Sequence, residues 1–235
     1  MRMLFRAVPW VVVAMGTTSA EAQVRKEADF RWYIGPQIGV MSFVTPAQTR
    51  ATVASAGGNI LIVAKRTGLL LQVDQSFGGT QLSRYTDSLA APPDGRVNVS
   101  FSSVRRYEGV LLGFLGRGYV EPYIGVGFGI AQAVSPRIAA TQAPPITSPG
   151  ALAIAEQNMS ELGGFGYGTL LLGVQLRVGG VTAFGQGQIT TSPSTKSGIS
   201  PATFGRLLQD NMYNFNAGVR VTLGSARERV GAGGY

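Results

Sequence analysis

The stretch of sequence that most constrains the fold covers residues 104–131, and it is predicted to form two long strands joined by the turn Gly116–Arg117–Gly118. In the second strand, large apolar residues stand at alternate positions from Val120 to Ile130, and the positions between them are mostly small. Because successive side chains of a strand point to opposite faces, one face forms a continuous apolar band. The pattern predicts a strand whose apolar face contacts lipid and whose other face borders the narrow interior of a barrel.

The composition fits a membrane barrel better than a soluble domain. Only 14% of the residues are charged, against roughly 25% in typical soluble domains, and 33 of the 235 residues are glycine. After residue 22, no apolar run reaches the roughly 18 residues that a transmembrane helix requires. A closed β-barrel is then the remaining way to satisfy the backbone hydrogen bonds inside a bilayer.

The chain contains no cysteine and no histidine. The first absence excludes disulfides, thiol catalysis and thiolate metal sites, and the second removes the usual general base, the commonest zinc ligand and every serine–histidine arrangement. The acidic residues Asp87, Asp94, Glu156 and Glu161 are too dispersed to form a calcium loop. We therefore predict a protein that is not an enzyme and that binds no cofactor or metal ion.

The N-terminus has the features of a secretory signal peptide. Arg2 and Arg6 supply positive charge, Val8–Met15 form a short apolar region, and Ala20–Glu21–Ala22 matches a small-x-small cleavage site. These features predict export through a cleaved signal peptide and a location in the bacterial outer membrane. The predicted domain organisation is a signal peptide at residues 1–22, an outer-membrane β-barrel at 23–223 and a flexible C-terminal tail at 224–235.

Alternating apolar residues predict eight strands, at about residues 31–43, 57–65, 69–77, 104–115, 119–131, 164–178, 181–191 and 212–223. Connections of two or three residues, Arg66–Gly68, Gly116–Gly118 and Gly179–Gly180, alternate with long ones. This asymmetry is typical of outer-membrane barrels. A short surface helix is predicted at Gly150–Leu162 within the third long connection. The four long connections are Val44–Ser55, Gly78–Ser102, Gln132–Leu162 and Ser192–Asp210.

Two segments, Pro122–Ala131 and Phe215–Leu223, carry a resemblance to the small eight-stranded outer-membrane barrels of the OmpA/OmpX type. The resemblance covers about residues 23–223. It implies an all-β fold, an antiparallel up-and-down transmembrane β-barrel with short periplasmic turns and long extracellular loops. It also implies insertion by the outer-membrane assembly machinery, which in this family reads an aromatic residue at the end of the last strand. Here Leu223 holds that place, twelve residues follow it, and the chain ends on Tyr235. No peptidoglycan-binding domain is expected in so short a tail.

Barrels of this size have interiors filled by side chains. Inward polar residues are therefore predicted to form a network in which opposite charges pair, because an unpaired buried charge is costly. Arg106 and Glu108 are both expected to point inward. A sealed network would stabilise the barrel, whereas an open one would form a narrow pore whose conductance falls when Arg177 or Arg220 is changed. The predicted lumen residues are Gln72, Asp74, Glu121, Gln175, Arg177, Gln186, Gln188, Asn214, Asn216 and Arg220. Aromatic residues predicted to lie at the membrane interfaces are Trp32, Tyr119, Tyr123, Tyr167 and Tyr213.

The predicted function is a structural or surface-interaction role without catalysis, as a monomer that contacts outer-membrane lipid and binds any extracellular ligand through its long loops. Nucleic-acid binding is not expected, because the basic residues that give the net charge of +8 are scattered rather than clustered. Two alternatives stay open. One is a narrow ion or small-solute pore. The other is a soluble periplasmic barrel that carries an apolar ligand, which would need large apolar residues on the inward faces.

Overall fold

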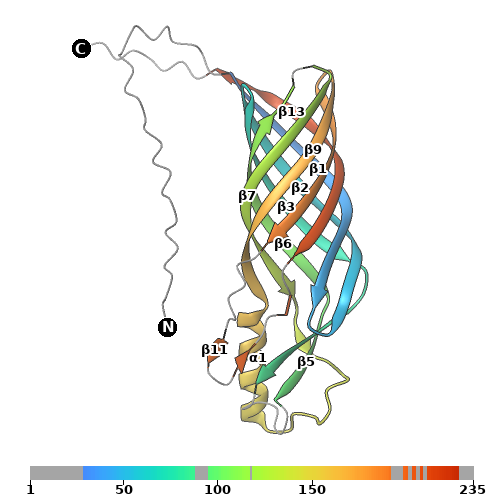
Figure 1. Ribbon diagram of the computed structural model, residues 1–235, viewed down its shortest axis with the longest axis vertical. Helices are drawn as coiled ribbons and strands as arrows, with labels where there is room; N and C mark the ends of the chain where they lie inside the picture. Colours follow the sequence, from blue (N-terminus) through green and yellow to red (C-terminus); the bar gives the residue numbers. More distant parts are fainter. Residues whose placement is uncertain are drawn as a thin grey trace, which may run out of the picture.

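The computed structural model describes residues 29–87, 95–116, 118–191, 198–200, 203–204, 207–208 and 211–227. Eight antiparallel strands form a closed barrel in which each strand pairs with its neighbours in chain order and the last strand pairs with the first (Figure 1). The eight-stranded up-and-down architecture predicted from the sequence is thereby confirmed. The barrel strands are β1 (Asp29–Thr45), β2 (Gln48–Ala64), β3 (Thr67–Phe77), β6 (Ser103–Phe114), β7 (Val120–Val134), β9 (Gly164–Val178), β10 (Val181–Thr191) and β13 (Met212–Arg227).

The predicted signal peptide at residues 1–22 lies outside the described residues, as does the tail from residue 228 onward. The first part of the predicted tail is strand, because β13 continues to Arg227 rather than ending at Leu223. Its final residues pair with the first residues of β1. We find no helix in the described part of the chain that is long and apolar enough to cross a membrane.

At one end of the barrel all the connections are short, and β1 begins and β13 ends there (Figure 1). β2 and β3 are joined by Lys65–Arg66, and β9 and β10 by the predicted two-residue turn Gly179–Gly180. Gly179 has a φ of 62°, in the left-handed region that two-residue hairpin turns require and that glycine adopts without a steric cost. We call this end the turn side and the opposite end the loop side.

One of the predicted long loops is wrong. Residues 44–55 do not form a loop, because β1 and β2 are joined by only Pro46 and Ala47, and Ser42 pairs with Thr52 across the hairpin. The outward face of β2 in this region carries Arg50, Thr52 and Ala54 instead of large apolar residues. The alternation is therefore weak in the sequence, and Pro46 is a turn residue within a much tighter connection.

The other three loop-side connections fold together into a domain that we call the cap, which comprises the described residues of 78–102, 135–163 and 192–211 (Figure 1). It contains the helix α1 (Pro149–Leu162), which confirms the predicted helix. It also contains a five-stranded sheet that the sequence did not predict. The strands of this sheet are β4 (Gln81–Asp87), β5 (Arg96–Phe101), β8 (Arg137–Ile138), β11 (Gly198–Ser200) and β12 (Thr203–Phe204).

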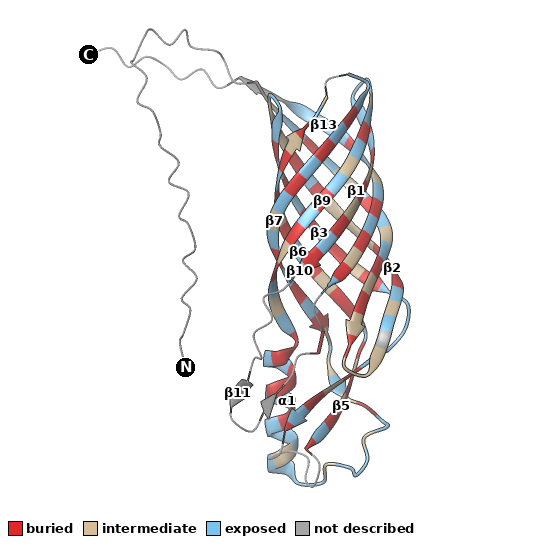
Figure 2. Ribbon diagram, in the orientation of Figure 1, coloured by how far each residue is buried: buried red, intermediate tan, exposed pale blue. Residues whose placement is uncertain are grey.

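The cap has its own hydrophobic core, which continues into the loop-side mouth of the barrel (Figure 2). Val97, Val99 and Phe101 of β5 are buried in it, together with Met159 of α1 and Phe43 of β1. Burial raises the pKa of the Tyr85 hydroxyl, which donates a hydrogen bond to the carbonyl oxygen of Ala155 at 3.1 Å. The loop-side end of the barrel is therefore covered by the cap.

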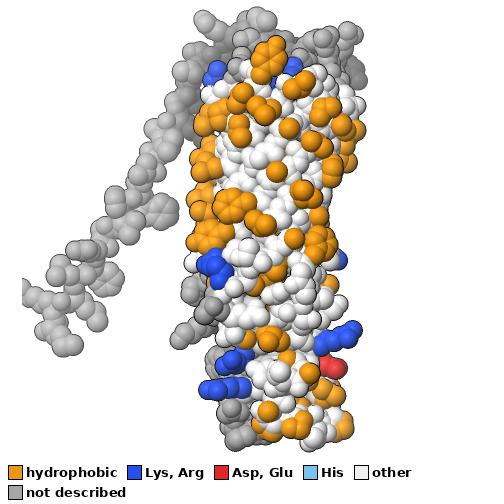
Figure 3. Space-filling view, turned by 90° about the vertical axis from the view of Figure 1, so that its right-hand side faces the viewer, with side chains coloured by type: hydrophobic (Ala, Val, Ile, Leu, Met, Phe, Trp, Pro, Cys, Tyr) orange, Lys and Arg blue, Asp and Glu red, His pale blue; other side chains and the backbone are white. Residues whose placement is uncertain are grey.

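The outer wall of the barrel is an apolar band, and Figure 3 shows hydrophobic side chains distributed over one face of it. Among the barrel-strand side chains that the structure describes, the charged ones that point outward are Arg50 and Arg105. Each is the third residue of its strand, so each lies near one edge of the band. The middle of the wall carries no charge in this described part of the chain.

Candidate functional site

The polar interior of the barrel collects the residues predicted for the lumen. Of the ten predicted residues, nine are buried, and the side chain of Arg177 is 24% exposed at the turn side. They come from strands β3, β7, β9, β10 and β13, whose inward faces alternate with the apolar outward faces. Three connected clusters of hydrogen bonds and ion pairs include all ten, with Asn214 and Gln188 at their loop-side ends.

The first cluster surrounds the fully buried ion pair between Arg106 and Glu108. Arg106 Nη2 lies 2.5 Å from Glu108 Oε2 and donates a further hydrogen bond to Gln188 Oε1 at 2.8 Å. The hydroxyl of Tyr167 accepts from Arg106 Nε at 3.1 Å, and its ring lies 5.4 Å from the guanidinium carbon. Gln72 Nε2 donates to the same carboxylate oxygen of Glu108 at 3.1 Å. Several hydrogen bonds thus support a charge pair that would be costly alone.

The second cluster links Asp74 to Arg220 through two amide side chains. Arg220 Nε donates to Asn59 Oδ1 at 2.5 Å, Asn59 Nδ2 donates to Gln37 Oε1 at 2.8 Å, and Gln37 Nε2 donates to Asp74 Oδ1 at 2.5 Å. Asn216 Nδ2 also donates to Asp74, at 3.3 Å. The chain of amides crosses four adjacent strands and connects two opposite charges that do not touch.

Arg220 is also held by an aromatic ring. The ring centroid of Phe184 lies 3.6 Å from the guanidinium carbon, which is the geometry of a cation–π contact. Among the described residues, the two terminal nitrogens of Arg220 have no hydrogen-bond partner. Phe184 therefore contributes directly to holding this buried charge.

The third cluster lies at the turn side of the interior. Glu121 Oε2 accepts a hydrogen bond from Gln175 Nε2 at 2.7 Å and forms an ion pair with Arg177 Nη2 at 2.8 Å. The guanidinium carbon of Arg177 lies 5.8 Å from the ring centroid of Tyr33. Across the three clusters, the carboxylates of Asp74, Glu108 and Glu121 match three arginines in number, so the charges in these clusters sum to zero.

Large apolar side chains also fill part of the interior, which the glycine-rich inward face of β7 did not predict. Leu61, Leu70, Leu112 and Leu171 are buried and belong to one cluster with Tyr123. They pack against one another in the half of the barrel toward the turn side. The inward faces therefore combine a polar network with an apolar cluster, and both occupy the lumen.

Two of the predicted interfacial aromatics are wrong. Tyr123 and Tyr167 are 1% and 4% exposed, and both point into the barrel, where their hydroxyls join the polar network. Trp32 and Tyr119 are exposed on the outside at the turn side, and Tyr213 lies half-buried on the outside near the loop side. The alternation of inward and outward positions along each strand could have distinguished the inward tyrosines from the outward aromatic residues. Tyr123 shares the parity of Glu121, and Tyr167 that of Gln175.

Sequence reasoning did not identify how central Arg106, Glu108 and Asn59 are to this network. The sequence predicted that Arg106 and Glu108 point inward, but not that they form the fully buried pair. Among the described residues, no group of three or more acidic side chains is placed to hold a metal ion. The hydrogen bonds and ion pairs of the interior connect strands of the barrel to one another.

No family model and no curated protein matches the sequence of the chain. Solved structures do match it. Neisserial surface protein A matches with a TM-score of 0.49 and 9% identity, over 81% of this chain and 96% of that one. Ail of Yersinia pestis, solved with a heparin analogue, matches with a TM-score of 0.41 and 8% identity, over 84% of this chain and 100% of that one. The N-terminal β-barrel domain of Pseudomonas aeruginosa OprF matches with a TM-score of 0.38 and 9% identity, over 80% and 97%.

Likenesses of this degree concern architecture and say nothing about a ligand or an activity. The fold itself rests on the strand pairing described above. In architecture, this chain is a small, closed, eight-stranded antiparallel β-barrel with an ordered cap on its loop side.

Proposed function

We propose that this protein spans the bacterial outer membrane and has a structural or surface-interaction role, without catalysis, in which the cap is the part that meets the exterior. The observation that carries the proposal is the inverted distribution of polarity. Apolar side chains such as Ile38, Leu111 and Phe128 are 65–77% exposed on the outer wall, while Arg106 and Arg220 are fully buried inside. A barrel of this kind suits a hydrocarbon solvent and would expose a large apolar surface in water.

The dimensions of the wall support the same proposal. The shortest barrel strands, β3 and β10, have 11 residues each, and about 9–11 residues in a tilted strand are enough to span a bilayer. Exposed aromatic residues border the apolar band, with Trp32 and Tyr119 toward the turn side and Tyr107 toward the loop side. Aromatic side chains favour the level of the lipid headgroups.

The interior supports a sealed barrel over a pore. The Arg106–Glu108 pair, the amide chain from Arg220 to Asp74 and the leucine cluster all lie within the lumen. At the loop side, the core shared by Phe43, Phe101 and Met159 joins the barrel mouth to the cap. A pore would require these groups to separate, and a carrier of apolar ligands would require the inward leucines to line an open space instead of packing together.

The cap is the part of the chain best placed to meet a partner. In outer-membrane barrels the longer connections face the outside and the short turns face the periplasm. The cap would then be extracellular, and its exposed residues would form the surface available to a ligand. The proposal includes export through the signal peptide predicted at residues 1–22 and insertion as a monomer by the outer-membrane assembly machinery.

Val126 tests the proposed lipid contact. It points outward from the middle of β7 and is 55% exposed. We expect Val126→Arg to lower the free energy of unfolding in lipid bilayers by about 2–4 kcal/mol, which is the cost of an arginine on the lipid face near the midplane. Urea-induced unfolding in vesicles, followed by fluorescence of Trp32, the one tryptophan after residue 22, measures the change.

Leu152→Arg is the matched control. Leu152 is an exposed leucine on α1, in the cap and away from the bilayer, so an arginine there should change the free energy of unfolding by less than about 0.5 kcal/mol. Equal and small effects at positions 126 and 152 would mean that the outer wall does not contact lipid. The proposed membrane-spanning role would then be wrong.

A further inference from the structure

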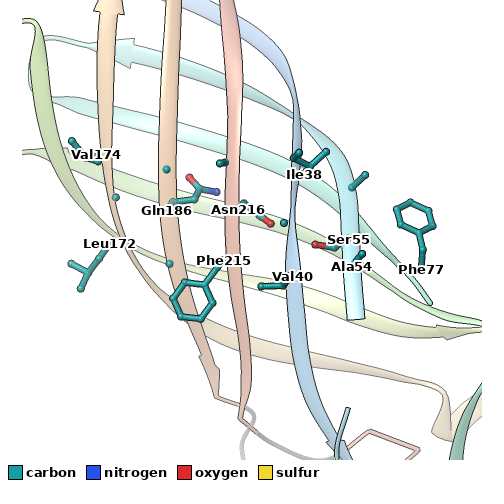
Figure 4. Close-up of a pocket in the computed structure, with 16 residues that line it drawn as sticks. Ile38, Val40, Ala54, Ser55, Phe77, Leu172, Val174, Gln186, Phe215 and Asn216 are labelled. Carbon is teal, nitrogen blue, oxygen red and sulfur yellow. The ribbon is translucent and has the colours of Figure 1, made fainter. Parts of the chain in front are cut away.

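A shallow apolar groove runs along the outer wall across β10, β13, β1 and β2 (Figure 4). Strand pairing places Gly187, Phe215, Val40 and Ala54 side by side, and the next outward row toward the turn side is Gly185, Ala217, Ile38 and Ala56. The small side chains of the glycine and alanine residues leave space at these positions of the outer wall. Leu172 of β9 and Phe77 of β3 line the two sides of the groove. The groove has a volume of about 1010 Å³.

The polar residues that line the groove do not make it polar. The side chains of Ser55, Gln186 and Asn216 are buried, and the two amides form hydrogen bonds inside the barrel, with Gln72 and Asp74. The surface that the groove presents outward is therefore hydrocarbon along nearly its whole length, which suits an acyl chain.

The positively charged side chain of Arg50 lies at the loop-side end of this groove. On β2 the outward positions continue from Ala54 through Thr52 to Arg50. Arg50 Nη1 donates to Ser42 Oγ at 3.1 Å, Thr52 Oγ1 lies 3.2 Å from the same hydroxyl, and the Arg50 guanidinium carbon lies 5.0 Å from the ring centroid of Tyr213. No carboxylate forms an ion pair with Arg50 in the described part of the chain. The arginine is held in place and its charge remains available.

We propose that this groove and Arg50 together form a binding site for one membrane lipid, with an acyl chain in the groove and a headgroup phosphate at Arg50. The inference rests on the proposed membrane-spanning function, because the acyl chain must reach the groove from a bilayer. Charge complementarity determines the class of lipid. Arginine donates paired hydrogen bonds to phosphate oxygens. The Ser42 hydroxyl accepts from Arg50 and Thr52, so its own O–H adds one more donor at the same level.

A second copy of the chain fits this surface less well. Two barrels that associate through the same face would present the same patch to each other about a two-fold axis. That arrangement would place a hollow opposite a hollow and would bring two Arg50 side chains into one interface without an acidic partner among the described residues. A flexible acyl chain can fill the hollow, and a phosphate can neutralise the arginine.

Native mass spectrometry of the full-length barrel released from detergent tests the site, with two chain-matched probes: dioleoyl phosphatidic acid, which is anionic, and dioleoyl phosphatidylcholine, which has no net charge. We expect one phosphatidic acid to be retained, with about fivefold preference over phosphatidylcholine, as one surface arginine contributes. Arg50→Gln should abolish the preference and leave phosphatidylcholine retention unchanged. Gly185→Leu should reduce the retention of both lipids, because the added side chain occupies the groove.

The controls separate the site from general effects. Gly113→Leu adds the same bulk to an outward glycine of β6 outside this groove, and Arg137→Gln removes an exposed charge in the cap. An ideal Cβ at Gly185 meets nothing within 4 Å, and one at Gly113 only a carbonyl oxygen at 4.0 Å, so both leucine variants should fold. Folding of each variant is checked by its migration on a gel before boiling.

Three results would overturn the proposal. The first is equal retention in wild type, Arg50→Gln and Gly185→Leu, the second is loss of retention in both controls, and the third is a mass corresponding to two protein chains instead of a protein and a lipid. Excess inorganic phosphate should compete for Arg50. A loss of the preference for phosphatidic acid, with unchanged retention of phosphatidylcholine, would support a phosphate contact at Arg50. Membrane insertion is measured separately, so a barrel that inserts without lipid preference would refute this inference alone.

Discussion

Arg106→Met is expected to lower the free energy of unfolding by about 3–5 kcal/mol, because it leaves Glu108 as a buried charge without its partner. Both side chains of the pair are at most 1% exposed, and the nitrogen that methionine removes lies 2.5 Å from the carboxylate. The substitution also removes the hydrogen bonds to Tyr167 and Gln188, which come from β9 and β10. The strands β6, β9 and β10 thus lose the side chain that connects them.

The adjacent residue gives the matched control. Arg105 lies on the outward face of the same strand and donates to Gln75 Oε1 at 2.8 and 2.9 Å near the loop-side edge. Arg105→Met should cost less than about 1 kcal/mol, as expected for a partly exposed polar contact. Replacing both members of the pair, Arg106→Met with Glu108→Leu, should restore most of the stability. A similar loss for the two single variants in vesicle unfolding would show that the interior pair does not stabilise the barrel.

Gly35→Ala is expected to lower the free energy of unfolding by about 3 kcal/mol or more, through a clash at the seam where the first and last strands meet. A Cβ added at Gly35 of β1 would overlap the backbone carbonyl oxygen of Val219 on β13. Backbone cannot rotate away as a side chain can, so β1 and β13 would have to separate. The pairing of these two strands closes the barrel.

Gly58→Ala is the control for the seam. Gly58 pairs with Pro36, the next residue along β1, and a Cβ there would lie 3.7 Å from the carbonyl oxygen of Gly35, an ordinary contact. The change in stability should stay within about 1 kcal/mol, since alanine also reduces the entropy of the unfolded chain. The unboiled, folded band on a gel is the measurement. Equal amounts of it for both variants would contradict close approach at the seam.

The sequence predicted the barrel wall well because its strands follow one simple alternation of apolar outward and inward residues. The predicted limits of β9 and β10 agree with the structure, as does the turn Gly179–Gly180 between them. In β9, large apolar residues alternate with inward residues from Leu170 to Leu176. Every strand of the wall repeats the same alternation of outward and inward residues, so one periodic pattern is enough to recognise each of them.

The cap could not be predicted in the same way, because its short strands do not share one alternating pattern of residues. Which of their residues are buried depends on the elements that pack against them. β5 buries Val97, Val99 and Phe101 only because α1 and the barrel mouth pack against them. Its six residues are bordered by turn signals that are typical of loops. The contacts join segments far apart in the sequence, such as the hydrogen bond from Ser83 to the carbonyl oxygen of Leu207 at 2.7 Å.

The sequence predicted which polar residues lie inside the barrel, but it did not predict which of them form hydrogen bonds with one another. Parity placed Asp74, Glu121 and Arg220 inside, whereas the actual partners depend on how the strands of the barrel are staggered against one another. The link from Arg220 to Asp74 passes through Asn59 and Gln37, and no spacing in the sequence relates these residues. The two tyrosines assigned to the interface were misplaced because residue type was given more weight than parity.

The most direct test of the membrane-spanning barrel is the electrophoretic mobility of the protein from fractionated cells, compared with and without boiling. We predict that the protein is found in the outer-membrane fraction and that the unboiled sample migrates differently from the boiled one, because a closed barrel stabilised by its interior pairs resists the detergent at room temperature. A protein recovered in the soluble periplasmic fraction, with the same mobility before and after boiling, would contradict the account.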